Sequence, residues 1–204
     1  MKTINLFMKR LIDIVGSGLG IVILLPILLF TIILIKLTMP GPIFFKQERV
    51  GKNEKTFKIL KFRTMKVDKE AEKKMDFSKD RDRITRLGKI LRRTKIDELP
   101  QLFHVFIGDM SLVGPRPTVM KQVHQYTDRQ KKRLEMRPGM TGLAQVNGNI
   151  TLDWEQRIEY DIEYVSGFSL YLDLKILLKT IAIVLLGEGK FKKERSKKTE
   201  DYVG

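Results

Sequence analysis

The sequence predicts a mainly helical α+β protein that starts with a membrane helix and continues into a small domain. Three observations carry this prediction. Residues 14–35 contain no charged side chain and are long enough to cross a bilayer as a helix. Extended apolar stretches on both sides of a Gly-Lys-Asn turn predict a short β-hairpin over residues 43–60. Beyond residue 85, apolar side chains recur at the three- and four-residue spacing of helices.

The apolar stretch 14–35 can lie in a membrane in two ways. A single span is the simpler one. However, Pro26 lies in its middle, where a proline removes a backbone hydrogen bond and kinks a helix. Both flanks are also basic, with Lys9 and Arg10 before the stretch and Lys36 after it, so a straight span places one cluster on the unfavoured side. A helix that breaks at Pro26 and returns keeps both clusters in the cytoplasm, and the residues alone leave both arrangements open.

The rest of the chain alternates between periodic and irregular segments. Helices are predicted over residues 85–93, 119–136, 154–165 and 170–186. The last of these is interrupted by charges, which is typical of a helix that lies on a membrane surface or packs on the domain. A glycine-bearing turn is expected at 137–142, and a short extended piece with a turn at 144–149. Residues 66–83 are expected to be an exposed loop or a loosely held helix, and the charged tail 190–204 to be disordered.

Composition restricts the partners that the protein can have. Lysine and arginine total 39 against 24 acidic residues, which gives a net charge of +15. Such an excess suggests an anionic partner: nucleic acid, acidic lipid headgroups or a phosphorylated substrate. The chain has no cysteine, which excludes disulfides and thiolate zinc sites, and its two histidines argue against a histidine-based metal site.

An acidic pair, Asp97 and Glu98, is the strongest candidate for a functional site. The pair precedes Pro100 and an apolar run, and because proline is well tolerated at the first position of a helix, we expect a helix to begin there. The partial positive charge of a helix start favours carboxylates. Arg92 lies upstream and Arg116 downstream, in the stiff sequence Gly-Pro-Arg-Pro. Carboxylates bracketed by arginines suit a metal and a phosphorylated ligand, and a solvated helix cap is the alternative.

Three further cations are candidates for ligand binding. Lys61 and Arg63 alternate with Phe62, so in an extended chain they share one face, which either holds a phosphate or is simply solvated. Arg137 opens the Pro-Gly turn, whose glycines allow close approach of the backbone to a ligand, although a plain turn is the simpler explanation.

Five sequence blocks occur in a characteristic order and spacing. They are KRLID at 9–13, PGPIFF at 40–45, KFRTM at 61–65, IDELPQL at 96–102 and GDMSLVGPRP at 108–117. By these blocks the chain resembles the bacterial sugar transferase family, the monotopic polyprenyl-phosphate phosphoglycosyl transferases, from Lys9 to about Leu186. Any single block is a weak signal, whereas their combination is highly specific.

The resemblance implies a re-entrant anchor over residues 1–39, broken at Pro26 and involving Lys9 and Arg10. It implies a cytosolic catalytic domain over 40–189 with interfacial amphipathic helices, followed by the flexible tail 190–204. The expected location is the bacterial inner membrane with the catalytic domain facing the cytoplasm. There the basic surface would meet anionic inner-leaflet lipids, and no nucleic acid is expected as a partner.

The resemblance also implies the reaction. A sugar-1-phosphate passes from a UDP-sugar to a polyprenyl phosphate, usually undecaprenyl phosphate, and UMP is released, as the first membrane step of a surface-glycan pathway such as exopolysaccharide biosynthesis. Asp97 is the nucleophile, Glu98 completes the dyad, and Mg2+ is required and held by both. Carboxylates can attack phosphorus to give an acyl phosphate, which leads to a ping-pong cycle. Phosphate oxygens are assigned to the basic side chains Lys61, Arg63, Arg92, Arg116 and Arg137.

The chain departs from the family pattern at a few positions. Leu25 replaces a frequent serine, His104 a frequent asparagine, Leu143 a tryptophan and Asn149 an arginine. Leu25 bears on the cap at the membrane break, and Leu143 and Asn149 lie in a region expected to contact the nucleotide or the sugar, so these two bear on sugar identity rather than on the reaction class. None of the four belongs to the acidic pair. Two alternatives to the ping-pong enzyme are a non-catalytic, membrane-anchored basic protein that binds anionic lipid or nucleic acid, and a one-step transferase in which Asp97 only holds metal.

Overall fold

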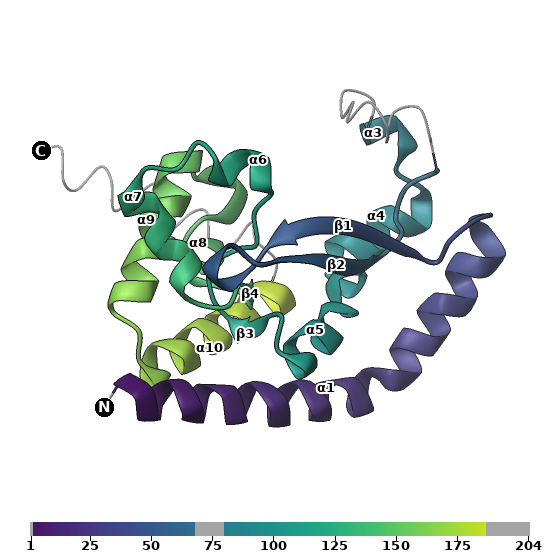
Figure 1. Cartoon of the computed structure of the whole chain (residues 1–204). Helices are drawn as coiled ribbons and strands as arrows, with labels where there is room; N and C mark the ends of the chain where they lie inside the picture. Colours follow the sequence, from purple (N-terminus) through teal and green to yellow (C-terminus); the bar gives the residue numbers. More distant parts are fainter. Residues whose placement is uncertain (1, 68–79, 187–204) are drawn as a thin grey trace, which may run out of the picture.

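The computed structural model describes residues 2–67 and 80–186, and its first element is one long helix, α1 (Lys2–Thr38). The helix lies along the base of the molecule and bends in its second half (Figure 1). Pro26 lies inside α1, and the helix continues through it. The predicted interruption of the helix at Pro26 is therefore replaced by a bend, because a proline removes one hydrogen bond while the neighbouring turns keep theirs. Residues 4–38 are long and apolar enough to cross a membrane, by length and composition only.

One face of α1 packs against the rest of the chain and the others are exposed. Side chains buried at helical spacing include Asp13, Ser17, Thr31 and Ile35. Small residues allow the close approach: a Cβ at Gly16 would lie only 2.9 Å from Leu112 Cδ1. The opposite faces expose large apolar side chains such as Val22, Ile23, Phe30 and Leu37. This distribution suits a helix that has protein on one side and lipid on the other.

The predicted hairpin is confirmed. Strands β1 (Phe44–Val50) and β2 (Thr56–Phe62) pair antiparallel, in a register that runs from Phe44 opposite Phe62 to Val50 opposite Thr56. The connection contains the short 3-10 turn η1 (Lys52–Glu54), in which Asn53 has a left-handed backbone (φ 53°). At the open end of the hairpin the rings of Phe44 and Phe62 stack, and Phe62 packs in one cluster with Leu28 and Ile35 of α1.

The segment after the hairpin is helical, as predicted from residue 85. It contains α3 (Asp80–Arg83), α4 (Arg86–Arg93), the 3-10 turn η2 (Ile96–Glu98) and α5 (Gln101–Ile107). Thr85 caps α4, and its hydroxyl accepts a hydrogen bond from the Gly88 amide. Gly88 lies so close to the hairpin that a Cβ there would meet the Thr64 carbonyl oxygen at 2.0 Å. The glycine therefore lets α4 pack directly on the chain leaving β2.

Two sequence predictions for residues 119–142 are wrong. The predicted single helix 119–136 consists of α6 (Met120–Val123), α7 (Asp128–Lys131) and the 3-10 turn η3 (Lys132–Glu135). Thr127 starts a new helix with a capping box, and the side chain of Arg133 is drawn into the interior, where it bonds Tyr126 and Asp161. The expected turn at 137–142 contains strand β4 (Gly139–Thr141), which pairs in parallel with β3 (Ser111–Val113).

The last third of the chain covers β3 and β4 with helices. The expected extended piece after Gly142 is instead helix α8 (Leu143–Val146), because Leu143, Ala144 and Val146 turn their side chains into the core. The 3-10 turn η4 (Asn149–Thr151) follows, and then α9 (Trp154–Ser166) and α10 (Leu170–Leu186), both as predicted. Helix α10 packs through Asp173 and Ile176 and exposes Leu174, Leu178 and Leu185. The predicted disordered tail lies outside the described residues.

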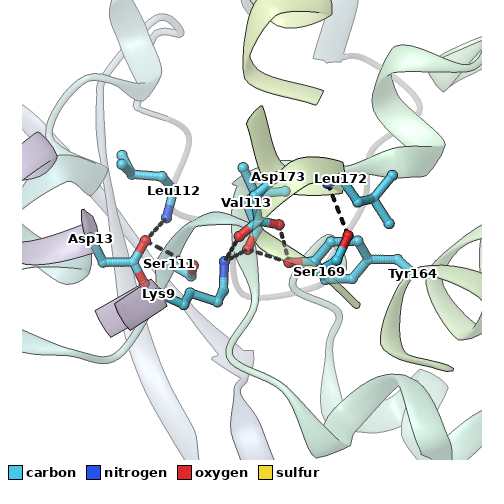
Figure 2. Close-up of polar contacts among 9 residues, drawn as sticks. All are labelled: Lys9, Asp13, Ser111, Leu112, Val113, Tyr164, Ser169, Leu172 and Asp173. Atoms are coloured by element: carbon cyan, nitrogen blue, oxygen red, sulfur yellow. Dashed lines mark hydrogen bonds and ion pairs between the residues drawn. The ribbon is translucent and has the colours of Figure 1, made fainter. Parts of the chain in front are cut away.

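A buried polar junction fastens α1 to the domain (Figure 2). Lys9 Nζ lies 2.7 Å from Asp173 Oδ2 and donates to the Val113 carbonyl oxygen, and Tyr164 donates to Asp173 Oδ1. Asp13 Oδ1 accepts hydrogen bonds from the Ser111 hydroxyl and the Leu112 amide. We call Lys9, Asp13, Tyr164, Asp173 and the β3 groups they bind the α1 junction. Burial and the nearby charge of Asp13 raise the pKa of Asp173, and the charge of Lys9 opposes this.

Candidate functional site

A cavity of about 540 Å³ lies between the hairpin and the segment from α4 to η2. Its lining contains the acidic pair and three of the predicted cations, Lys61, Arg63 and Arg92. Residues directly opposite each other in an antiparallel pair lie on the same face, and Lys61 is opposite Phe45, so the face of β1 and β2 that carries Lys61 also carries Gln47 and Arg49. Gln47 and Arg49 line the cavity too. The fold thus brings together groups that are far apart in the sequence.

The acidic pair sits in the turn η2, one step before α5. The chain enters this turn through Lys95, whose backbone is left-handed (φ 59°). Pro100 occupies the N-cap of α5 rather than its first helical position. The predicted helix start is therefore correct to within one turn. Asp97 is 8% exposed, so its carboxylate faces the protein and the cavity rather than open solvent.

The two carboxylates are in different electrostatic environments. Burial, followed by the charge of Glu98, raises the pKa of Asp97, against the opposing charges of Lys61, Arg92 and Lys95. Burial acts in the same direction on Glu98, but Lys61 and Arg116 outweigh it and lower the pKa of Glu98. Lys61 Nζ lies 2.5 Å from Glu98 Oε1, and Arg116 Nη2 lies 3.7 Å from the same oxygen. Environments that separate the pKa values of neighbouring acids are typical of sites where the acids have different roles.

Two of the predicted arginines have structural partners at the cavity wall. Arg63 donates to the carbonyl oxygens of Met39 and Pro40, which joins the end of α1 to the cavity. Arg92 Nε donates to the Thr64 hydroxyl at 2.9 Å. Both side chains line the cavity while they are held by these contacts. Fixed guanidinium groups lose little conformational entropy when an anion binds.

Arg116 and Arg137 are placed differently. Arg116 borders a small pocket beside the main cavity, and its carbonyl oxygen accepts a hydrogen bond from the buried Arg133. Arg137 is not brought to this cavity: its Nε donates to the Gly108 carbonyl oxygen, and it lines a separate pocket with Lys9 and Asp13. The role of Arg137 in substrate binding stays a prediction.

The predicted anchor residues Lys9 and Arg10 both bind the domain. Lys9 belongs to the α1 junction, and Arg10 donates to the carbonyl oxygens of Val105 and Phe106 at the end of α5. A cation at the carboxyl end of a helix satisfies carbonyl groups that have no partner within the helix. The departures from the family pattern are also placed: His104 Nδ1 lies 3.0 Å from Asp109 Oδ2, Leu143 is in the core, and Asn149 has a positive φ of 46°.

The donor set determines how the site can hold Mg2+. Within residues 2–67 and 80–186, no group of three or more histidine, cysteine or acidic side chains could hold a metal. Asp97 and Glu98 supply two carboxylates, and Mg2+ is commonly bound by one or two carboxylates together with substrate phosphates. The pair therefore fits Mg2+ in combination with a phosphorylated ligand rather than as a closed metal site.

Sequence reasoning missed Arg49, Thr64, Lys95 and Gln101. The first three line the main cavity, and Arg49 and Gln101 line the adjoining pocket. A signal for Arg49 exists in the sequence, since alternation in a strand places it on the face of Lys61 once the hairpin register is known. No comparable signal exists for Lys95 and Gln101, whose positions depend on how η2 and α5 pack.

Comparison with known proteins gives a consistent result. Residues 4–187 match the family described as bacterial sugar transferase. An uncharacterized sugar transferase of Bacillus subtilis, EpsL, is 44% identical over 90% of this chain and 90% of its own length. The UDP-glucose:undecaprenyl-phosphate glucose-1-phosphate transferase of Klebsiella pneumoniae is 44% identical over 89% of this chain and 41% of its own. A UDP-N-acetylgalactosamine-undecaprenyl-phosphate N-acetylgalactosaminephosphotransferase of Aeromonas hydrophila is 44% identical, over 90% and 45%. The chain thus spans less than half of the latter two relatives.

Proposed function

Because the chain belongs to the bacterial sugar transferase family, we propose that it transfers a sugar-1-phosphate from a UDP-sugar to a polyprenyl phosphate and releases UMP. The observation that carries this proposal is the buried acidic pair, Asp97 and Glu98, at a cavity lined by cations. Relatives that are named for this chemistry match 89% and 90% of the chain. A surface-glycan pathway such as exopolysaccharide production is the expected context, since a Rhizobium leguminosarum relative is named for it.

In the first half-reaction, an Asp97 oxygen forms a bond to the phosphorus that carries the sugar. The bond from that phosphorus to the oxygen of UMP breaks, and UMP departs with the electron pair. No proton transfer is needed, because UMP leaves as a stable anion, so neutralisation of charge by Lys61 and Arg92 dominates. Burial raises the pKa of Asp97, which makes its carboxylate a more basic nucleophile than that of Glu98.

In the second half-reaction, an oxygen of the polyprenyl phosphate attacks the same phosphorus and Asp97 is released unchanged. Asp97 and Glu98 would hold Mg2+, which supplies positive charge to the phosphate oxygens when it is bound. Lys61 keeps Glu98 ionised and oriented through their 2.5 Å contact. Because the acceptor is already an anionic phosphate, the cycle requires no general base.

We further propose that α1 enters the membrane from one face and returns to it. Both ends of α1 contact the same domain: Lys9 binds Asp173, whereas Ile35 and Met39 pack with Phe62. A helix that crosses a bilayer has its ends on opposite sides of about 30 Å of hydrocarbon. Attachment of both ends to one domain therefore supports a re-entrant arrangement, in which the bend of α1 that Figure 1 shows turns the helix back towards the domain. The expected setting is the cytoplasmic face of the inner membrane, where the basic surface attracts anionic lipids.

The test uses the purified chain in nanodiscs with Mg2+, undecaprenyl phosphate and a panel of UDP-sugars, and it follows release of UMP. We expect release with one donor or a few donors and loss of release in Asp97→Asn. Silence with every donor, combined with unchanged binding of anionic vesicles in Asp97→Asn, would favour the non-catalytic membrane-bound alternative.

A second experiment separates the ping-pong cycle from one-step transfer. The chain is mixed with a UDP-sugar labelled in the sugar phosphate, without lipid acceptor. The ping-pong cycle predicts up to one equivalent of UMP and a label on the protein that added polyprenyl phosphate removes. Release of UMP only when the lipid is present would identify one-step transfer.

A further inference from the structure

A small pocket of about 40 Å³ opens beside the main cavity and shares Arg49, Lys61 and Glu98 with it. Its other functional lining residues are Gln101 and Arg116. We call this pocket the alcove. On this measure a site for one water molecule needs about 10–15 Å³, so the alcove has room for a compact group and not for a sugar or a base.

The alcove has an excess of positive charge. Burial, followed by the charge of Arg116, lowers the pKa of Arg49, so these two guanidinium groups are close enough to repel each other. Among the described lining residues, Glu98 is the one carboxylate, and it already lies near both Lys61 and Arg116. Three cations thus face one anion. Like charges placed together at a partly buried site are costly unless an anion binds between them.

The alcove also contains a buried donor that lacks an acceptor. Gln101 is 3% exposed, and its Nε2 has no hydrogen-bond partner among the described residues. An unsatisfied buried donor costs free energy, and in natural proteins such groups call for an explanation. The position of Gln101 is fixed by the first turn of α5, directly after the buried Pro100. Because Gln101 lines the alcove, a small rotation of its amide towards an oxyanion bound there would supply the missing acceptor.

One part of the alcove wall is formed by Gly139 and Met140 of β4. A Cβ at Gly139 would lie 2.1 Å from the Gly114 amide nitrogen, so the backbones are in contact there. These contacts and the hydrogen bond from the Gly139 amide to the Pro115 carbonyl oxygen hold this part of the wall in place. The excess of donors is therefore built into the packing of the domain.

We propose that the alcove is a binding site for a phosphate monoester, formed by Arg49, Gln101 and Arg116. Guanidinium groups bind phosphate oxygens through paired donors, and the Gln101 amide adds a neutral one. The inference rests on the proposed function, which has two phosphate monoesters: the departing UMP and the polyprenyl phosphate that replaces it. Both present the same dianionic group, so the chemistry of the alcove suits either one.

Binding measurements without turnover test this site. UMP, a soluble short-chain prenyl phosphate and inorganic phosphate are titrated into wild type, Gln101→Leu and Arg49→Gln, with Arg129→Gln as the control for charge at an exposed site. We expect binding of at least one ester to weaken about tenfold in both alcove variants, which corresponds to the loss of one charge-assisted hydrogen bond. We also expect Gln101→Leu to unfold, without ligand, at the same temperature as wild type or a higher one, because it removes an unsatisfied donor.

Comparison of the ligands shows which phosphate monoester the alcove binds, the departing UMP or the polyprenyl phosphate acceptor. Weaker binding of UMP alone assigns the alcove to the departing phosphate, and weaker binding of the prenyl phosphate alone assigns it to the acceptor. Wild-type affinity for all three ligands in both variants overturns the proposal. If Arg49→Gln fails to fold, Arg49→Lys replaces it. The tests of function and alcove are separable: absence of UMP release from every donor removes the transferase proposal, whereas weakened phosphate binding in the alcove variants would still establish the anion site.

Discussion

The α1 junction and the main cavity are built from the same kinds of charged and polar side chain, but these side chains have different roles in the two places. In the junction, Lys9 is matched by Asp173, and Asp13 is matched by hydrogen-bond donors of β3 (Figure 2). In the alcove beside the main cavity, cations outnumber carboxylates and the Gln101 amide has a donor without an acceptor. A polar cluster whose groups satisfy one another fixes architecture. A cluster that remains incomplete is prepared for a ligand that completes it.

The largest effect should come from the cavity. Asp97→Asn removes the proposed nucleophile, and we expect turnover to fall by at least about a thousandfold, which is about 4 kcal/mol in the activation barrier. Because burial raises the pKa of Asp97, the neutral amide should cost no stability. UMP release and the thermal unfolding midpoint measure the two quantities, and an active Asp97→Asn variant would contradict the assigned role.

The opposite pattern is expected at the α1 junction. Lys9→Met leaves Asp173 buried without its cation, which should lower the free energy of unfolding by about 3–5 kcal/mol. The double variant Lys9→Met/Asp173→Leu should recover part of this loss, because it removes the unpaired charge as well. Denaturant unfolding in detergent provides the measurement. A loss below about 1 kcal/mol in the single variant would show that the junction does not hold the two parts together.

A third cluster, Arg133 with Asp161, is structural like the α1 junction but also affects the site. Arg133 bonds Asp161 and the backbone carbonyl oxygen of Arg116, and so holds Arg116 in place. Burial raises the pKa of Asp161 to about 6, although Arg133 and Arg116 oppose it. The folded protein then keeps this proton at pH values where the unfolded chain, with a pKa near 3.8, has lost it. Stability should therefore fall as the pH rises from about 4 to about 6, by about 1–3 kcal/mol.

The matched variant for this pH effect is Asp161→Asn, which cannot titrate. Between about pH 4 and pH 6, the fall in stability that Asp161 causes in wild type should be absent from this variant. Contributions from other titrating groups should be the same in both proteins. Turnover should also fall about tenfold, because the anchoring of Arg116 is lost. Equal slopes of stability against pH in wild type and Asp161→Asn would refute the assignment of the titration to this carboxyl.

The comparison also explains what the sequence could predict. The long apolar N-terminal helix, the hairpin, α4, α9 and α10 each depend on a local pattern of apolar spacing or turn residues, and their presence is confirmed, although α1 continues through Pro26. The predictions for residues 119–142 were wrong because the structure of this region depends on residues that are distant in the sequence. Arg133 is pulled inside by Asp161, and Gly139 pairs with the strand that starts at Ser111. No pattern within 119–142 contains those partners.

The site residues also divide into those that the sequence could predict and those that it could not. Asp97, Glu98 and Lys61 lie in recognisable blocks, Arg92 lies four residues before one of them, and the fold brings all four to one cavity. Gln101 lies in one of those blocks as well, but its significance comes from what it lacks, an acceptor for its buried amide. A missing partner is visible only in three dimensions.

The smallest effect should come from an arginine–carboxylate pair that is exposed, whereas Arg133–Asp161 is buried. Arg129 Nη2 lies 2.5 Å from Glu159 Oε2, and these side chains are 67% and 49% exposed, against 4% and 1% for Arg133 and Asp161. Both acids lie on α9, two residues apart.

A double-mutant cycle of Arg129→Gln with Glu159→Gln should give a coupling of at most about 1 kcal/mol that decreases with added salt, because water screens the exposed charges. The same cycle on Arg133 and Asp161 should give a larger, salt-insensitive coupling. Equal couplings would mean that burial does not set the strength of these ion pairs, and the contrast between matched and incomplete clusters would lose its electrostatic basis.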